Sequence, residues 1–330
     1  MRRTMGRTTI SPSFCHGPPA MNPPTTLPAA SSDLPDAVAR VATSVVAVVP
    51  PWRSAGSGAV WRDGHVVAAA HRVWRAPRVQ VVLPDGESAT AVVKGVDATT
   101  DLALLAIEGE SAAAPLPALE RSAEDSGSRP GEFVFAVARG SSGLTQASFG
   151  HVGAASGAWR TWRGGLVDRL IRLDGGLYPG FSGAPVADAA GRALGIATSA
   201  LTRIHGVVLP WTTVDRVLGQ LHSQGRVVQP YLGIVVQAVR LPEAQATTLG
   251  VTTGAGLLVT GTDGPAATAG IMVGDVLVMV GSARVESIDD LQRALDGLGV
   301  GSQVAVIVGR GGDRKEVTVE VGERTHRGCR

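Results

Sequence analysis

The stretch Tyr178-Pro179-Gly180-Phe181-Ser182-Gly183-Ala184-Pro185 places a serine among glycines, directly before an apolar run that is typical of a strand. A serine hydroxyl is a poor nucleophile unless a neighbouring base takes its proton. The glycine at 180 permits a turn in which backbone N–H groups converge on one point, as an oxyanion hole requires. Gly-x-Ser-Gly also occurs in ordinary turns, so the motif indicates catalysis only if the chain supplies a base and a carboxylate.

The composition indicates a globular chain with room for two domains. Hydrophobic residues make up 44% of the 330 positions and aromatic residues only 4%, which favours cores of Val, Ala and Leu. The 30 basic and 28 acidic residues nearly balance, and no run of Lys or Arg occurs. We therefore expect no nucleic-acid partner.

The ends of the chain carry no targeting or metal signal. Cys15 and Cys329 lie in the terminal segments and have the spacing of neither a disulfide framework nor a zinc site. No apolar stretch reaches the roughly 18 residues that indicate a membrane-spanning helix. The N-terminus has Arg2, Arg3 and Arg7 but lacks the apolar run of a signal peptide, so this N-terminus, if genuine, indicates a cytoplasmic protein.

Short apolar runs separated by turn residues predict a β-rich domain over 33–225. Residues 1–32 are rich in Pro, Ser, Thr and Arg and are expected to be disordered. A short helix is expected at 33–41, and about a dozen short strands follow with almost no helix among them, which is typical of β-barrels or a sandwich. A helix at 213–224, capped by Gly225, closes the domain.

The pattern of the chain changes near position 228. The block 228–322 reads as strand, strand, short helix, strand, longer helix, strand and strand, with the helices expected at 266–269 and 287–298. This order predicts a second, smaller α+β domain. The charged residues 323–330 are expected to form a flexible tail.

Elimination among the seven histidines leaves His71 as the candidate base. It directly follows the apolar run 66–70, at a strand end, whereas the others lie in tails, turns, a loop, a helix or a strand. Asp101 begins the apolar run 101–105, where a carboxylate can accept a hydrogen bond from an imidazole. Each residue alone is read more simply as a surface histidine or a turn aspartate, and their order with Ser182 is what favours a triad.

His71, Asp101 and Ser182, in this order and with these flanks, resemble the triad of the chymotrypsin-fold serine proteases of the HtrA/Deg group. The segments that carry the resemblance are Ser54 to Val60, Ala69-Ala70-His71-Arg72-Val73, Gly95 to Leu105, Asp174 to Pro185, and Gly191 to Ile196. The segments that resemble the PDZ domain of the same group are Tyr231-Leu232-Gly233-Ile234, Gly264 to Ile271, and Gly274 to Leu277. Together they extend over about 35–325.

The resemblance implies a mainly β fold, a chymotrypsin-like double six-stranded antiparallel barrel followed by a small α+β PDZ domain. His71 would be the general base and then acid, Asp101 its orienting carboxylate, and Ser182 the acylated nucleophile. The N–H groups of Gly180 and Ser182 would form the oxyanion hole. Peptide bonds would be hydrolysed through an acyl-enzyme, and no metal or cofactor is expected.

The resemblance also implies two binding sites. The apolar residues expected near the substrate pocket are Leu177, Ile196 and Ala197, which favour small aliphatic side chains at the cleavage position. Backbone N–H groups of the loop Tyr231-Leu232-Gly233-Ile234 would bind the carboxylate of a peptide C-terminus, and the peptide would add a strand to the sheet edge. Without the resemblance, this loop would be read as a first strand with a glycine bulge.

Three residues depart from the group's usual Asn-Pro-Gly-Asn-Ser-Gly-Gly-Pro: Tyr178, Phe181 and Ala184. Phe181 is bulky and lies between the two oxyanion donors, where a flipped peptide would abolish the hole. Ala184 replaces a glycine, which would cost about 1 kcal/mol or more if the backbone there needed a positive φ. The triad itself is complete, so these departures indicate a divergent member with slow or regulated activity.

The segment 139–165 is long and rich in glycine, with Trp159 and Trp162. It would correspond to a loop that responds to activation in the HtrA/Deg group, and a plain flexible loop with surface tryptophans is an equal alternative. The first interpretation predicts an active site with two states. Activity that did not depend on PDZ ligand, unfolded protein or temperature would contradict it.

The leading hypothesis is an ATP-independent serine endopeptidase that acts on unfolded or misfolded proteins. The resemblance implies a homotrimer, and a location in the periplasm or cell envelope as the alternative to the cytoplasm. The competing hypothesis is a catalytically weak PDZ adaptor or holdase chaperone, which only Phe181 and Ala184 favour. An unrelated β-rich binding protein would require every matching segment to be a coincidence.

Overall fold

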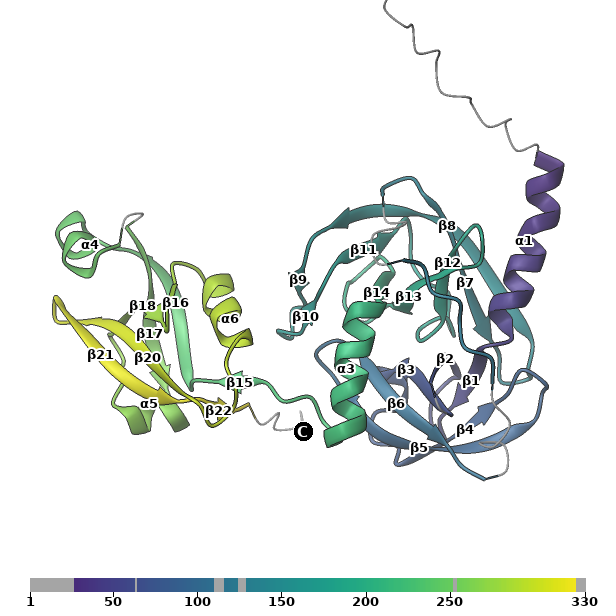
Figure 1. The fold of residues 1–330 in the computed structure, drawn as a ribbon, viewed down its shortest axis with the longest axis horizontal. Coiled ribbons are helices and arrows are strands. Elements are labelled where there is room, and N and C mark those ends of the chain that lie inside the picture. The colour runs from purple at the N-terminus through teal and green to yellow at the C-terminus, as the bar shows by residue number, and fades with distance from the viewer. Residues whose placement is uncertain (1–26, 63, 110–115, 124–128, 252–253, 325–330) are drawn as a thin grey trace, which may run out of the picture.

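The fold consists of two β-barrels followed by a smaller α+β lobe (Figure 1). The computed structural model describes residues 27–62, 64–109, 116–123, 129–251 and 254–324. Our expectations for 1–26 and 325–330, including both cysteines, lie outside the described residues. The predicted fold class, mainly β with two closed six-stranded antiparallel barrels and a small α+β domain, is confirmed.

Valine and alanine side chains form the interior of the first barrel. Its strands are β1 (Val45–Val49), β2 (Gly56–Arg62), β3 (His65–Ala69), β4 (Arg78–Val82), β5 (Ser88–Asp97) and β6 (Leu102–Ile107). They close in the order β1-β2-β3-β6-β5-β4. Buried side chains such as Val46, Val66 and Leu105 fill the interior. β-Branched and small residues suit the inward positions of such a narrow barrel.

The second barrel has the order β11-β14-β13-β12-β7-β8. Its strands are β7 (Phe133–Arg139), β8 (Thr145–Ser156), β11 (Leu170–Leu173), β12 (Pro185–Asp188), β13 (Ala193–Thr198) and β14 (Val207–Pro210). Its interior contains Val134, Val186 and Ala197. A separate hairpin of β9 (Trp159–Arg160) and β10 (Leu166–Val167) lies on the side of the smaller lobe (Figure 1).

The two barrels share a core where they meet. Leu102 and Leu104 of the first barrel lie in one buried cluster with Phe135 and Ile196 of the second. Helix α3 (Trp211–Gln224) adds further buried side chains to this cluster, among them Leu218 and Leu221. The shared core fixes the barrels relative to each other, so residues at the ends of strands from both can be held in one site.

Helix α1 (Leu27–Ala42) begins earlier than the sequence analysis expected. Residues 27–32, which we expected to be disordered, are helical. Pro28 lies at the second helical position, where its missing N–H removes no helical hydrogen bond, and Ala29 and Ala30 have the highest helix propensity. The end of α3 agrees with its prediction, because Gly225 is left-handed (φ 71) and its N–H donates to Leu221 C=O.

The smaller lobe is a sheet with three helices. Its strands are β15 (Pro230–Tyr231), β16 (Ile234–Arg240), β17 (Ala255–Thr262), β18 (Val276–Val280), β19 (Ala283–Arg284), β20 (Gln303–Arg310), β21 (Asp313–Glu320) and β22 (Gly322–Glu323). The helices are α4 (Glu243–Leu249), α5 (Gly264–Ala269) and α6 (Ile288–Asp296). The main sheet has the order β16-β17-β18-β20-β21, and β19 pairs with β18.

Two features of this lobe differ from the prediction. Helix α4 was not expected, because its two threonines lower the helix propensity of a short segment. Residues 323 and 324, expected to lie in a flexible tail, are ordered: β22 pairs with β15, and Arg324 N–H donates to Gln229 C=O (2.9 Å). This pairing joins the end of the lobe to its beginning.

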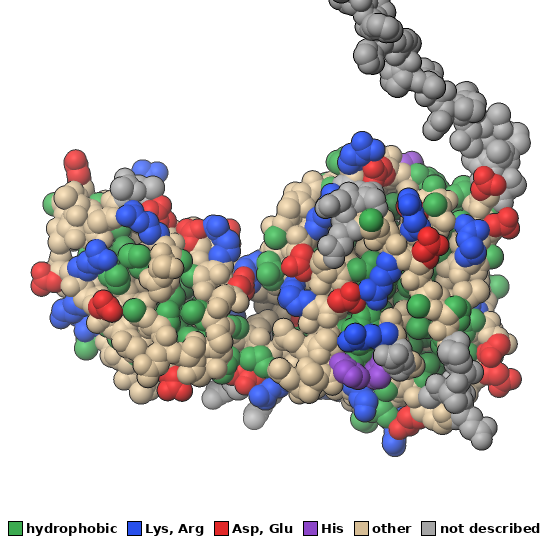
Figure 2. Space-filling view, in the orientation of Figure 1, with side chains coloured by type: hydrophobic (Ala, Val, Ile, Leu, Met, Phe, Trp, Pro, Cys, Tyr) green, Lys and Arg blue, Asp and Glu red, His purple; other side chains and the backbone are tan. Residues whose placement is uncertain are grey.

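The visible surface carries charges of both signs. Figure 2 shows basic and acidic side chains interspersed over both lobes on this face, with no field of a single sign. Among the helices in the described part of the chain, none is both long and apolar enough to span a bilayer.

Candidate active site

Asp101 holds both the backbone and the ring of His71. β3 ends at Ala69, and the chain turns into the short helix α2 (Ala70–Val73), which carries His71. Asp101 Oδ1 accepts the His71 backbone N–H at 2.8 Å, and Oδ2 lies 2.8 Å from His71 Nδ1. With Nδ1 as the donor in this contact, the ring keeps Nε2 as its acceptor nitrogen.

The loop before β6 fixes Asp101 itself. Asp101 has a positive φ of 61, a conformation in which Asp is enriched among non-glycine residues, and it is only 3% exposed. Its C=O accepts the Ala70 N–H at 2.9 Å. Upstream, the Asp97 carboxylate accepts hydrogen bonds from the N–H and hydroxyl groups of Thr99 and Thr100. Hydrogen bonds therefore hold this buried loop both at Asp101 and at the residues before it.

Thr198 is a partner of Asp101 that the sequence analysis missed. Its Oγ1 donates to Asp101 Oδ2 at 2.5 Å, and the residue is 1% exposed. Thr198 ends β13 of the second barrel, so this bond crosses the junction between the barrels. A buried polar residue at the end of an otherwise apolar strand is the sequence signal that could have identified it.

Ser182 lies at the same junction. Ser57 N–H in β2 donates to Ser182 C=O at 3.2 Å. A Cβ added at Gly183 would lie 2.0 Å from Ser57 O and 3.1 Å from Ala69 N, so the serine segment passes directly against β2 and the end of β3. In the described residues, Ser182 Oγ is hydrogen-bonded to Ser199 Oγ (3.0 Å) and not to the His71 ring.

The segment before Ser182 forms a tight turn. Phe181 N–H donates to Tyr178 C=O at 3.1 Å, and Gly180, the third residue of the turn, has φ 92. Proline at the second position and a glycine with positive φ at the third are typical of a type II turn. Gly180 C=O accepts a hydrogen bond from Ser57 Oγ at 2.9 Å.

The residues that depart from the usual serine segment are accommodated. Phe181 is 3% exposed and packs among the interior side chains of the second barrel. Ala184 is fully buried in the same cluster. Among the described residues, the only non-glycine positions with positive φ are Arg75 and Asp101, so the strain considered for Ala184 does not arise.

The three residues expected near the substrate pocket pack in two different cores. Consecutive residues of a strand point to opposite faces. Ile196 therefore packs in the core between the barrels, whereas Ala197 faces the interior of the second barrel. Leu177 is half-buried against that interior. Ile196 is separated from the other two by the sheet itself.

Two arginines lie beside His71. Arg53 donates to His71 C=O at 3.2 Å, and Arg72 donates to Ser54 Oγ at 3.0 Å. Burial, and then repulsion from Arg53, lowers the pKa of Arg72 below its usual value, against the attraction of Asp101. The His71 side of the site is therefore positively charged.

The loop 231–234 leaves two N–H groups without a backbone partner. The C=O groups of Leu232 and Gly233 accept the N–H groups of Ala266 and Asp263, each at 2.8 Å. Within the described part of the chain, no backbone acceptor is bonded to the N–H of Leu232 or Gly233. Gly233 has φ 80, and a Cβ there would lie 2.1 Å from Asp263 O, so only glycine fits.

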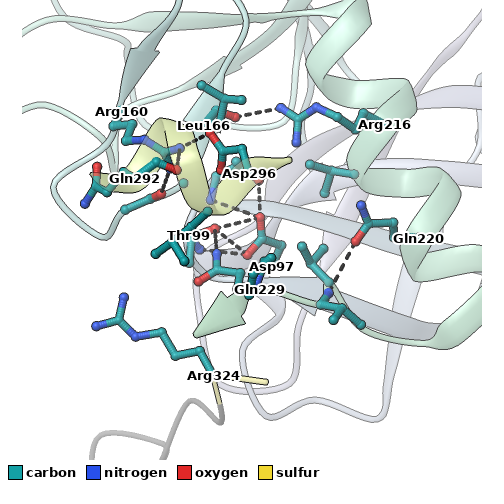
Figure 3. Close-up of a pocket in the computed structure, with 18 residues that line it drawn as sticks. Asp97, Thr99, Arg160, Leu166, Arg216, Gln220, Gln229, Gln292, Asp296 and Arg324 are labelled. Atoms are coloured by element: carbon teal, nitrogen blue, oxygen red, sulfur yellow. Dashed lines mark hydrogen bonds and ion pairs between the residues drawn. The ribbon is translucent and has the colours of Figure 1, made fainter. Parts of the chain in front are cut away.

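A cleft between the barrels and the smaller lobe contains a second polar cluster (Figure 3). Arg160 of β9 donates to Gln292 C=O (3.2 Å) and pairs with Asp296, both on α6. The neighbouring Thr161 Oγ1 donates to Thr99 C=O at 2.7 Å, in the loop that leads to Asp101. Hydrogen bonds thus connect α6 to this loop through the β9–β10 hairpin.

Comparison with known domain families agrees with the two-part architecture. Residues 56–196 match a trypsin-like peptidase domain, and residues 226–321 match a PDZ domain. The first match runs from β2 into β13 and includes His71, Asp101 and Ser182. The second covers the smaller lobe.

Curated relatives that are named as serine proteases match most of this chain. The chain is 29% identical over 287 residues to the serine protease HhoB of Synechocystis (83% of this chain, 67% of the relative). It is 31% identical over 274 residues to a periplasmic serine endoprotease of DegP-like type from Brucella suis (81% of this chain, 52% of the relative). The chain thus spans about half the length of the DegP-like relative.

A solved structure has the same fold. The HtrA-type protease AlgW with a decapeptide superposes with a TM-score of 0.72 at 25% identity, over 88% of this chain and 99% of that one. The likeness extends through both the barrels and the smaller lobe, because it covers nearly all of the described residues.

Proposed function

Because this chain belongs to the HtrA-type serine endopeptidases with a trypsin-like and a PDZ domain, we propose that it hydrolyses peptide bonds of unfolded or misfolded proteins through an acyl-enzyme. The catalytic residues of this proposal are His71, Asp101 and Ser182. The observation that carries it is the double hydrogen bond of Asp101 to the backbone and the ring of His71. That contact presents Nε2 as a base, which is the function of the carboxylate in such triads.

The reaction begins with a rotation of the Ser182 side chain. Ser182 Oγ leaves Ser199 Oγ and turns to His71 Nε2, which takes its proton as Oγ attacks the substrate carbonyl. The resulting imidazolium is stabilised by Asp101 and gives the proton to the leaving amine. Water then repeats the sequence on the acyl-enzyme, with His71 again as the base.

The oxyanion hole of this mechanism consists of the N–H groups of Gly180 and Ser182. Neither N–H donates to a backbone acceptor in the described residues, and the turn that links them is held by its own hydrogen bonds. Donors that are fixed before the reaction stabilise the developing negative charge without reorganisation.

The smaller lobe is proposed to bind peptide C-termini. The free N–H groups of Leu232 and Gly233 suit a carboxylate, and the peptide would add a strand beside β16. The AlgW structures contain a decapeptide and a tripeptide, which supports a peptide as ligand here. The proposal includes a homo-oligomer, a trimer by family resemblance.

The competing hypothesis, a catalytically weak PDZ adaptor or holdase, loses its support. It depended on Phe181 and Ala184, and both are buried in the second barrel without left-handed strain.

The proposal is tested by labelling the purified protein with a fluorophosphonate probe, which acylation-type serine nucleophiles attack. Ser182→Ala and His71→Ala are run beside the wild type, followed by digestion of casein. We expect labelling and cleavage in the wild type and neither in the two variants. A folded wild type that is not labelled, even with unfolded substrate or C-terminal peptides, overturns the proposal and favours the adaptor.

A further inference from the structure

Ser57 of β2 directs its backbone N–H and its hydroxyl toward the serine segment. It is 1% exposed. Its N–H donates to Ser182 C=O at 3.2 Å, and its Oγ donates to Gly180 C=O at 2.9 Å. The same Oγ accepts a hydrogen bond from the backbone N–H of Arg139 at 3.1 Å. Because an N–H only donates and a carbonyl only accepts, the hydroxyl proton must point at Gly180 C=O.

These bonds hold the peptide that lies between the two proposed oxyanion donors. The Gly180–Phe181 peptide is bonded at its C=O by Ser57 and at its N–H by Tyr178 C=O. The donor peptides Pro179–Gly180 and Phe181–Ser182 adjoin it on either side. A rotation of the central peptide changes ψ of Gly180 and φ of Phe181, which connect it to the two donor peptides, so holding this peptide restrains the direction of both donor N–H groups.

Contacts on the Cβ side of Gly180 do not provide this restraint. Apart from its chain neighbours, a Cβ added at Gly180 would meet only Ala55 O among the described residues, at 3.9 Å, so the space on that side is open. Glycine also has the widest choice of backbone conformations. The turn can therefore lose its shape unless hydrogen bonds hold it, and Ser57 provides the hydrogen bond to its central carbonyl.

Arg139 anchors this arrangement to the rest of the domain. Its guanidinium is buried and donates to the C=O groups of Ala42, Val45 and Gly143, at 2.7 to 2.8 Å. These carbonyls come from α1, β1 and the turn before β8. Because three hydrogen bonds fix the Arg139 side chain, the backbone N–H of Arg139 is held in place as the donor to Ser57 Oγ.

We propose that Ser57 is a positioning residue that holds the Gly180 and Ser182 N–H groups in the arrangement that binds the oxyanion. This inference rests on the proposed function, and Ser57 acts through the turn without touching substrate. Its loss should weaken transition-state binding and leave ground-state binding unchanged, which separates it from a structural role.

The test compares Ser57→Ala with a matched control and a conservative variant. Ser44→Ala is the control, because Ser44 is equally buried (2% exposed) and its hydroxyl also donates to a backbone carbonyl, Pro117 C=O at 2.6 Å. Ser57→Thr keeps the hydroxyl on a strand that tolerates β-branching. The measurements are kcat and KM on a peptide substrate, the inhibition constant of a peptide boronic acid, whose tetrahedral adduct places an oxygen in the hole, and thermal unfolding.

We expect Ser57→Ala to lower kcat by about tenfold or more, below the roughly 10²–10³-fold loss on removing an oxyanion donor. KM should stay within about twofold and boronate affinity should fall in proportion to kcat/KM. Ser57→Thr should restore part of the loss, and Ser44→Ala should behave as wild type.

Two outcomes overturn this inference alone. A Ser57→Ala protein with wild-type kcat and boronate affinity does so, as does an equal loss in Ser44→Ala, while the proposed function stands in both cases. A wild type that neither hydrolyses peptide nor binds the boronate overturns the proposed function and this inference together.

Discussion

Thr198 Oγ1 lies 2.5 Å from Asp101 Oδ2, the same oxygen that lies 2.8 Å from His71 Nδ1. The threonine belongs to the second barrel and the other two residues to the first. Because Asp101 is almost fully buried, a bond to its charged carboxylate is stronger than one in water. Thr198 therefore fixes the carboxylate from the barrel that carries Ser182.

Replacing Thr198 by valine should reduce turnover. Thr198→Val keeps the shape but removes the donor, and a hydrogen bond to a charged group contributes about 1.5–3 kcal/mol, so we expect kcat to fall by roughly 10- to 150-fold. Thr198→Ser keeps the hydroxyl and should retain most of the activity. Steady-state kinetics beside thermal unfolding provides the measurement, and a folded Thr198→Val protein with wild-type kcat would contradict the role of this bond.

Removing the Ser199 hydroxyl should make Ser182 more reactive. In Ser199→Ala, Ser182 Oγ no longer has to give up its 3.0 Å hydrogen bond before it turns to His71. A neutral hydrogen bond contributes about 1 kcal/mol, so the rate of fluorophosphonate labelling should rise by up to about fivefold. Ser223→Ala, on the exposed face of α3, is the control. Slower labelling would mean that Ser199 supports the reactive position of Ser182.

Breaking the contact between Arg160 and α6 should uncouple the lobes. If the β9–β10 hairpin transmits the state of the PDZ domain, Asp296→Asn and Arg160→Gln should bring the ratio of peptide-stimulated to unstimulated cleavage close to one. Asp289→Asn, an exposed acidic position of the same helix, should leave the ratio unchanged. Cleavage is measured with and without saturating C-terminal peptide, and an unchanged ratio in both test variants refutes the two-state active site.

Acid should destabilise the PDZ domain through Asp275. Burial alone would raise the pKa of this carboxyl, but two hydrogen bonds from Arg310 (2.7 Å each) and one from Met272 N–H outweigh it and hold the pKa below its ordinary value of 3.8. A carboxyl whose pKa is lowered by folding stabilises the folded state at pH values above its pKa in the unfolded chain. This stability is lost as the pH falls through the pKa of the folded state.

Asp275→Asn should therefore lower the free energy of unfolding of this lobe at pH 7 by about 3 kcal/mol, the usual cost of leaving a buried partner unpaired. The difference from wild type should shrink as the pH is lowered through 4 and below. Denaturant unfolding at several pH values measures it. An equal difference at all pH values would show that the carboxylate charge is not what stabilises the lobe.

Local patterns were enough to predict a β-rich domain and the segments that meet in the site. Short apolar runs separated by turn residues predicted β-barrels or a sandwich. The two six-stranded barrels followed only from the resemblance to the HtrA/Deg group. His71 and Asp101 could be chosen because they stand at the ends of apolar strands. Residues 27–32 of the first helix and the whole helix Glu243–Leu249 were not anticipated, because helical segments with proline or threonine depend on tertiary packing more than on propensity.

The sequence by itself determined which residue types could perform serine-nucleophile chemistry and that Gly180 permits the turn before Ser182, because both depend on local chemistry and backbone freedom. Only the tertiary structure decided that Thr198 binds Asp101, that Ser57 binds Gly180, and that Ile196 packs in the core between the barrels while Ala197 faces the interior of the second. The first two relationships connect residues of different barrels. The third concerns which face of β13 carries each side chain. They depend on register and on the packing of the two barrels, which long-range contacts set and no local sequence pattern records.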